Sequence, residues 1–179
     1  RIATLDDVVL MSASSFVNLY RRMPVYFASL DGEQLVPDVR WFPTVRIATA
    51  AVRALLAGPS AWLRDVVQTG APDGTQLGIG AVTVTDQVAT VALSAEAGTA
   101  TEGQRNLLLT QLDATLERVP GAAVSDVLVT VGDGGPWAST ATTVPLRDVT
   151  PPSGPYVLAD GRLLGAQAAY LDSLVEVVR

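Results

Sequence analysis

The alternation of apolar and polar residues between 72 and 94 predicts a two-stranded β-hairpin. Apolar residues recur at every second position on both sides of a short polar break: Val82 and Val84, then Ala89, Val91 and Leu93. Threonines occupy much of the other face, so the pattern is that of a half-buried antiparallel pair, not of a parallel strand covered on both faces. Another element must therefore cover the apolar side.

The helix predicted directly after the hairpin can provide this cover. Thr101 and Gln104 form a capping-box pattern, in which each side chain bonds to an otherwise unpaired backbone N–H group. Apolar residues then follow at helical spacing: Leu109, Leu112, Leu116 and Val119. Pro120–Gly121 ends the helix, and residues 127–131 alternate again as a third strand. The order strand, strand, helix, strand predicts a compact α+β unit.

The N-terminal part predicts a short helix followed by a strand. Ser12 can cap the helix, and Arg21–Arg22 at its end favour the negative end of the helix dipole. Pro24–Ala28 is rich in strand-forming residues and is followed by the turn pair Asp31–Gly32.

The next segment predicts an extended piece and two helices. Leu35–Phe42 is extended, but Pro37 cannot donate to a ladder, which places it at a sheet edge or outside the sheet. Thr44 is the predicted cap of a helix that ends at Gly58. The apolar residues around Trp62 suggest a second, short helix.

The composition changes after residue 136. Five prolines occur between 136 and 155, which favours an extended surface connection. Tyr156–Leu164 predicts a hairpin around Asp160–Gly161, and residues 170–178 have helical spacing. We therefore divide the chain into a lead-in segment at 1–22, a globular domain at 23–136 and an appendage at 137–179. Because the chain begins at Arg1, we expect it to be an excised piece of a longer protein.

Charge and composition exclude several classes of function. The 179 residues carry a net charge of −6, so no basic surface is expected for nucleic acid. The chain has no His, Cys or Lys, and therefore no Ser-His-Asp triad, thiolate or Schiff base. A carboxylate hydrolase stays open in principle, but the acidic residues are scattered in turns and Asp6–Asp7 reads as a solvated loop. Gly132–Gly135 reads as a strand-end turn. We expect no enzyme activity, cofactor or metal.

Three tryptophans are candidates for partner contacts, since Trp is enriched in binding hot spots. Trp62 lies on an apolar helix face and is expected in the core. Trp137, beside Pro136 in the connector, is the best candidate for exposure and for partner binding.

An ordered set of motifs resembles the GerMN domain family of sporulation and germination proteins over about residues 23–135. The motifs are Val25–Phe27, Leu35–Pro37, Leu55–Pro59, Pro72–Thr75, Val88–Ser94, Gln111–Leu112 with Thr115–Leu116, and Val119–Gly121 with Val124. Leu5–Tyr20 and Val36–Phe42 are more specifically similar to the LpqB family of actinobacterial lipoproteins. Members often have Asp-Gly at the hairpin turn, whereas this chain has Asp86–Gln87. We therefore expect another turn type here, because Gln tolerates positive φ poorly.

The resemblance implies an α/β domain similar to ring-building motifs, with a small, mainly antiparallel sheet and helices on one face. It implies no active site. It also implies a parent protein held on the outer face of the cell membrane by a lipid anchor upstream of this chain, with a β-propeller downstream. The implied partner is the extracytoplasmic region of the sensor kinase of the MtrA–MtrB two-component system, which links the domain to cell-wall homeostasis and division.

Two other functions stay open beside this interaction module. One is a binding module for a cell-wall glycan or peptide, which needs a concave pocket with polar groups and aromatic walls. The other is ring assembly by fold analogy. The oligomeric state and the docking surface do not follow from the sequence.

Overall fold

The computed structural model of the chain describes residues 11–78, 80, 82–132 and 134–137, and the backbone of 147–148, 156–159 and 162–165. Asp6–Asp7, most of the proline-rich connector, the Asp160–Gly161 turn and the helix predicted at 170–178 lie outside the described residues. The chain divides into compact units at 1–148 and 149–179. In the second unit β8 (Tyr156–Ala159) and β9 (Arg162–Gly165) pair antiparallel, as the predicted hairpin requires. The domain boundaries at 22 and 136 stay predictions.

The first sheet is built on a long antiparallel pair. β1 (Tyr20–Ser29) and β2 (Gln34–Pro43) pair along nearly their whole length, and the predicted Asp31–Gly32 turn joins them. β3 (Val67–Gln68) pairs with the end of β1, and β7 (Arg147–Asp148) runs parallel to the start of β2, in the order β3-β1-β2-β7. Pro37 lies in the part of β2 beyond β7, where a missing N–H group costs no described ladder bond.

The second sheet contains the predicted hairpin and third strand. β4 (Thr83–Thr85) pairs antiparallel with β5 (Val88–Leu93), and β5 pairs parallel with β6 (Asp126–Val131). The crossover between the parallel strands contains the short 3-10 helix η1 (Ala95–Thr99) and α3 (Glu102–Glu117). The predicted single sheet is therefore two sheets, since β5 and β6 pair with each other and not with β1 or β2.

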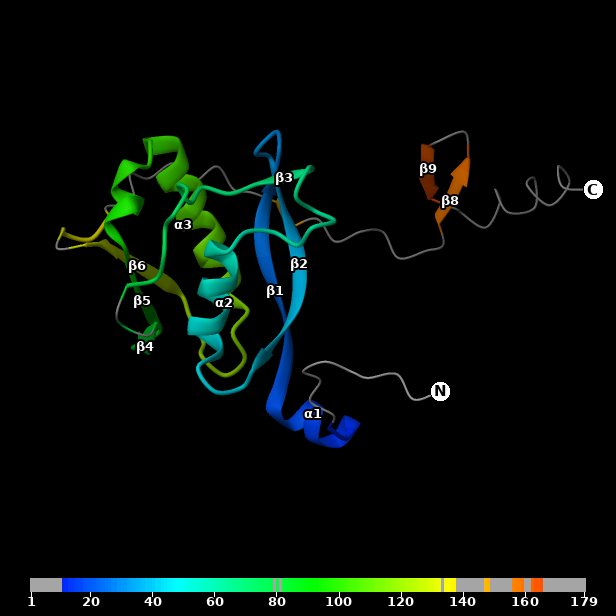
Figure 1. Cartoon of the computed structure of the whole chain (residues 1–179), viewed down its shortest axis with the longest axis horizontal. Helices are drawn as coiled ribbons and strands as arrows, with labels where there is room; N and C mark the ends of the chain where they lie inside the picture. Colours follow the sequence, from blue (N-terminus) through cyan, green and yellow to red (C-terminus); the bar gives the residue numbers. More distant parts are fainter. Residues whose placement is uncertain are drawn as a thin grey trace, which may run out of the picture. The chain divides into compact units, whose positions relative to one another are not determined.

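Two helices lie between the sheets. Figure 1 shows α2 (Ile47–Leu56) and α3 with the β1–β2 pair on one side and β5–β6 on the other, and α3 contacts both β1 and β6. Each sheet thus has helices packed on one of its faces. The predicted α/β class is confirmed, and antiparallel pairs are in the majority.

The capping box at the start of α3 forms as predicted. The Thr101 hydroxyl accepts from the Gln104 N–H at 3.3 Å, and the Gln104 side chain accepts from the Thr101 N–H at 3.0 Å. Leu109, Leu112 and Leu116 are buried, and they pack in the core that both sheets share.

Polar side chains of α3 also reach the edge of β1 beside β3. The Thr115 hydroxyl accepts from the Tyr26 N–H at 3.1 Å, and the Gln111 amide donates to the Tyr26 carbonyl at 3.1 Å. Gln111 also accepts from the Gly70 N–H at 2.8 Å. A Cβ at Gly70 would lie 2.4 Å from the backbone of α3, so only glycine allows this approach. These buried side chains make the hydrogen bonds to the β1 backbone that a longer neighbouring strand would otherwise make.

Three local predictions are wrong. Asp86 and Gln87 have φ values of 51° and 65°, so the hairpin keeps the positive-φ geometry of a type I′ turn without glycine. Thr44 does not cap α2, because the chain turns for two more residues and Arg46 occupies the N-cap position of a helix that begins at Ile47. The Thr44 N–H donates to the Leu19 carbonyl at 2.8 Å. The segment before β3 forms successive turns instead of a short helix.

Three other local predictions hold. Ser12 caps α1 (Ala13–Leu19) by accepting from the Ser15 N–H at 3.0 Å. The Arg21 guanidinium donates to the carbonyl groups of Val17 and Tyr20, so it does neutralise the C-terminal end of this helix. Gly58 ends α2 with φ of 90°.

Candidate functional site

The β1–β2 pair has one buried face, and its other face is open near the start of β1 but buried further along, at Tyr26, Ala28 and Leu35. Met23, Val25 and Phe27 point inward and are buried. Because side chains alternate along a strand, Arg22 and Pro24 lie on the opposite face, and the strand register places them across from Trp41 and Val39.

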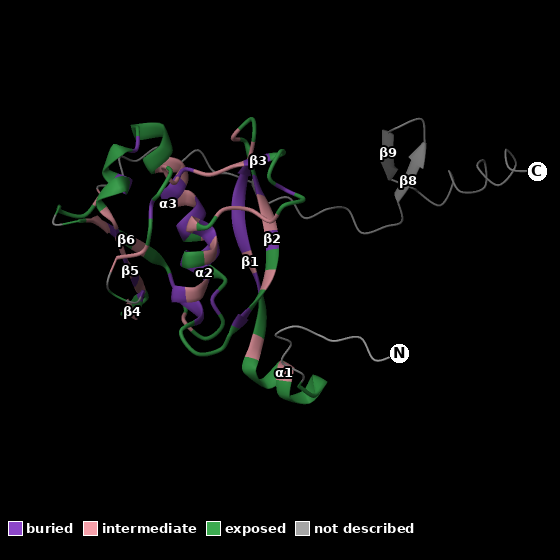
Figure 2. Ribbon diagram, in the orientation of Figure 1, coloured by how far each residue is buried: buried purple, intermediate pink, exposed green. Residues whose placement is uncertain are grey.

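At the start of β1 this open face meets α1. The Phe16 ring stacks on Tyr20 with centroids 4.9 Å apart and meets Trp41 edge-on at 4.9 Å. Trp41 is nevertheless 50% exposed. We call Phe16, Tyr20, Val39 and Trp41 the aromatic patch. No residue of α1 is buried, and Val17 and Leu19 are exposed beside the patch. Figure 2 shows α1 and the adjoining end of β1 without buried residues, in contrast to the central part of β1.

The opposite end of β1 carries a second exposed apolar group. Trp62 is 72% exposed, Leu30 63% and Val66 55%. The pairing of Val67 with Ser29 brings Val66 and Leu30 next to each other at the edge strand β3. We call Leu30, Trp62 and Val66 the Trp62 end. Leu30 follows Tyr20 of the aromatic patch by ten residues of extended chain, which corresponds to about 30 Å.

The expectation that Trp62 lies in the core is wrong, because the segment forms turns and offers no helical face to bury it. Trp137 is only half-buried, and its N–H donates to the Val129 carbonyl at 2.8 Å. The Arg105 guanidinium lies 5.8 Å from the centre of its ring. The role of Trp137 in partner binding stays a prediction. The rings of Trp41 and Trp62 are more exposed to solvent. The sequence feature that could have indicated an exposed Trp62 is its position close to the turn-forming residues Pro59 and Ser60.

A buried polar cluster joins β2 to the end of α2. The Arg40 guanidinium donates to Asp38 at 2.6 Å and to the Gly58 carbonyl at 2.7 Å. The Ser60 N–H donates to Asp38 at 2.8 Å and its hydroxyl at 3.0 Å. Burial alone would raise the pKa of Asp38, but these hydrogen bonds and the charge of Arg40 outweigh it and hold the pKa below its ordinary value. The cluster is a structural clamp, because every polar atom of the carboxylate is engaged.

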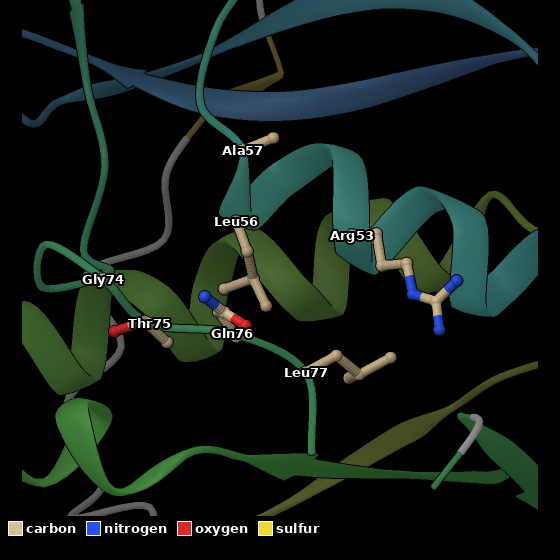
Figure 3. Close-up of a pocket in the computed structure, with 7 residues that line it drawn as sticks. All are labelled: Arg53, Leu56, Ala57, Gly74, Thr75, Gln76 and Leu77. Carbon is tan, nitrogen blue, oxygen red and sulfur yellow. The ribbon is translucent and has the colours of Figure 1, made fainter. Parts of the chain in front are cut away.

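A pocket of about 490 Å³ lies between α2 and the segment before β4. Figure 3 shows Arg53 and Leu56 extending from α2 towards Gly74, Thr75, Gln76 and Leu77. The Thr75 hydroxyl is buried and has no hydrogen-bond partner among the described residues. The lining residues include no acidic or aromatic side chain. The pocket therefore lacks the carboxylate pair of a glycoside hydrolase and the stacking walls of a glycan site.

The acidic residue with the largest resolved shift lies elsewhere. Partial burial, together with the charges of Asp126 and Glu117, raises the pKa of Asp113 on α3 to about 6. Within the described residues no group of three or more acidic residues is placed to hold a metal ion. No described helix has the length and apolar character needed to cross a bilayer.

Comparison with known proteins matches this fold to a family. The family model Germane, described as "Sporulation and spore germination", matches residues 24–134. The chain is also similar in fold to the tandem GerMN domains of the sporulation protein GerM from Bacillus subtilis, with a TM-score of 0.52, 19% identity, and coverage of 75% of this chain and 43% of that one. The first GerMN domain of the same protein gives a TM-score of 0.51 at 17% identity, with coverage of 66% and 94%.

Relatives in sequence are lipoproteins of actinobacteria. Lipoprotein LpqB of Bifidobacterium longum is 29% identical over 92% of this chain and 28% of its own length. Lipoprotein LpqB of Cutibacterium acnes is 37% identical over 74% of this chain and 22% of its own length. The chain thus spans about a quarter of the relatives that it matches.

Proposed function

The chain belongs to the Germane (GerMN) domain family, and from this premise we propose that it is a non-enzymatic protein-interaction module of a membrane-anchored lipoprotein of the LpqB kind. It acts outside the cytoplasm and docks on the extracytoplasmic region of an MtrB-like sensor kinase. Docking biases the kinase between its two signalling states, by no more than its differential affinity for them. Through this equilibrium it modulates cell-wall homeostasis and division.

The observation that carries the proposal is the Trp62 end. An exposed tryptophan together with exposed aliphatic residues is the composition of a protein-binding hot spot, and Trp62 precedes Val66 by four residues. The charged residues that flank these positions in the sequence have both signs: Asp31, Glu33, Arg64 and Asp65. Mixed charges at the rim suit a protein surface, which can place a complementary group opposite each one. The short edge strand β3 also keeps backbone groups available for pairing.

The test is a binding titration between this chain and the purified kinase ectodomain, followed by calorimetry. We expect micromolar or tighter binding, which Trp62→Ala weakens about tenfold or more. Trp41→Ala is the matched control, because it removes an exposed tryptophan at the opposite end of β1 and is expected to leave the affinity unchanged. No detectable binding at micromolar concentration, or equal losses in both variants, would count against the proposal.

A second candidate function rests on the pocket. The Arg53 guanidinium and the Gln76 amide, with Leu56 and Leu77 as apolar walls (Figure 3), suit a short peptide with a free carboxylate more than a glycan. A heteronuclear NMR titration with acetyl-Ala-Ala and with its C-terminal amide tests this. Shifts of pocket residues with the acid and not the amide, lost in Arg53→Gln, support a peptide site. Identical weak responses to both would remove it.

A further inference from the structure

The α1 end of the molecule leaves an apolar surface uncovered at the start of β1. Val17 and Leu19 on α1, Val39 and Trp41 on β2, and Val45 in the following loop are all exposed. The Phe16 ring joins α1 to the patch, and the hydrogen bond from the Thr44 N–H to the Leu19 carbonyl brings Val45 beside the helix. These contacts place the residues at one end of the β1–β2 pair.

Among the described residues 11–78, the charges around this surface have a single sign. Arg22 lies opposite Trp41 in the register, Arg21 is held by carbonyl groups of α1 and Tyr20, and Arg46 lies one residue beyond Val45. Residues 11–30 and 39–64 contain no aspartate or glutamate. Of the three acidic residues between them, Asp31 and Glu33 lie at the turn beyond the other end of β1, and Asp38 is buried and paired with Arg40. In a chain of net charge −6, this end is therefore a local cationic region.

We propose that the α1 end binds the surface of an anionic lipid bilayer. Indole and phenol rings are enriched at the headgroup level of a bilayer, because each has an apolar body and a polar group that can hydrogen-bond to water. The aromatic patch contains both ring types. Val45, which is 75% exposed, adds aliphatic area that enters the acyl boundary. Arg21, Arg22 and Arg46 lie beside the phosphate groups, which guanidinium binds in pairs of hydrogen bonds.

The charge pattern favours this occupant over a protein. A rim with one sign of charge, distributed around rings and aliphatic side chains, complements a laterally uniform anionic surface, whereas the mixed charges at the Trp62 end do not. Contact through α1 directs β1 away from the bilayer and holds the Trp62 end about 30 Å from it. The contact depends neither on the kinase nor on a lipid anchor.

The experiment measures binding of the chain to vesicles of equal parts phosphatidylglycerol and phosphatidylcholine, with pure phosphatidylcholine as reference. We expect binding to the anionic vesicles alone, weakened by salt. Trp41→Ala is expected to lower the partition coefficient about tenfold and Arg22→Gln about fivefold. The matched controls are Trp62→Ala and Arg64→Gln, which remove the same residue types at the other end and are expected to change nothing.

A spectroscopic readout locates the contact independently of these losses. A variant with Trp41 as its only tryptophan, made by Trp62→Phe and Trp137→Phe, is expected to shift its emission to the blue on anionic vesicles. A variant that keeps only Trp62 is expected to show no shift. Circular dichroism of each variant confirms that it is folded. Absence of binding, equal binding to neutral vesicles, or a shift at Trp62 instead of Trp41 overturns the proposal. Self-association that Trp41→Ala abolishes, without vesicle binding, assigns the patch to a second copy of the chain.

Discussion

The two faces of the β1–β2 pair separate residues that stabilise the fold from residues that are exposed for binding. On the inner face, Phe27 is fully buried and Asp38 is enclosed by Arg40 and Ser60. On the outer face, one residue further along, Val39 is exposed and Trp41 contacts only one side of the Phe16 ring edge-on. Alternation along the strand places these neighbouring positions on opposite faces. Residues of the inner face are constrained by folding, whereas Val39 and Trp41, at the open end of the outer face, are available for contacts.

The largest contrast is expected from truncating the inner face. Phe27→Ala removes a fully buried ring from the shared core and is expected to lower the free energy of unfolding by about 3–5 kcal/mol. Urea unfolding followed by circular dichroism measures this. A loss below about 1 kcal/mol would break the comparison, because it would mean that the inner face is not packed.

The buried carboxylate tests whether the inner face also depends on charge. Asp38→Ala leaves Arg40 without its partner and the Ser60 N–H unsatisfied, so we expect a loss of about 2–4 kcal/mol. Asp65→Ala, an exposed aspartate, serves as the control.

The pH dependence gives the sign of this contribution. The pKa of Asp38 is lowered in the folded state, so its stabilisation is present above the ordinary value of 3.8 and is lost as the pH falls through the folded value. The difference between wild type and Asp38→Ala should therefore shrink in acid. A difference that grows in acid would contradict the clamp.

A smaller effect is expected at the solvent side of α3. The pKa of Asp113 is raised to about 6, so the stability associated with its protonated form is complete below the ordinary value of 3.8 and is lost as the pH rises through about 6. Asp113→Asn should be more stable than wild type above pH 6, by about 1 kcal/mol after allowance for solvent screening of this exposed group. Thermal unfolding at several pH values measures it, and a gain that is equal at all pH values would point to another cause.

The smallest effect is expected from the outer face. Trp62→Ala should change the free energy of unfolding by about 0.5 kcal/mol or less, because its ring is mostly exposed, and Trp41→Ala by about 1 kcal/mol, because half of its surface is buried and it packs edge-on against Phe16. Trp41→Ala should nevertheless weaken vesicle binding strongly and leave kinase binding unchanged, whereas Trp62→Ala should weaken kinase binding strongly and leave vesicle binding unchanged. A loss of several kcal/mol in either variant would place that ring in the core instead.

Local features account for most of the correct predictions. The capping box at Thr101, the Ser12 cap, the Gly58 terminus and the alternation of Val88–Leu93 all depend on residues within a few positions of one another. The errors arose where pairing or packing overrides the local preference of a residue. The Thr44 N–H bonds to the Leu19 carbonyl while the chain turns on to Arg46 before α2 begins, and the pairing of Thr85 with Val88 leaves two residues, Asp86–Gln87, for the turn despite the cost of positive φ.

The candidate sites were harder to predict than the fold. Sequence pattern alone assigned Trp62 to the core and Trp137 to the surface, because exposure of a ring depends on what packs over it. Trp137 is partly covered by Arg105, which lies more than thirty residues earlier in the chain. The contact of Phe16 with Trp41, which builds the aromatic patch, likewise depends on the pairing of β1 with β2.

The sequence by itself determined the local elements, the absence of imidazole, thiol and amine chemistry, and the family to which the chain is similar, since each of these follows from residue identity or short-range periodicity. The tertiary structure alone decided that the strands form two sheets around shared helices, that Gln111 and Thr115 close the edge of β1, and which faces stay open. Whether a face is exposed depends on which elements pack over it. That packing depends on contacts between residues as far apart in the sequence as Tyr26 and Thr115.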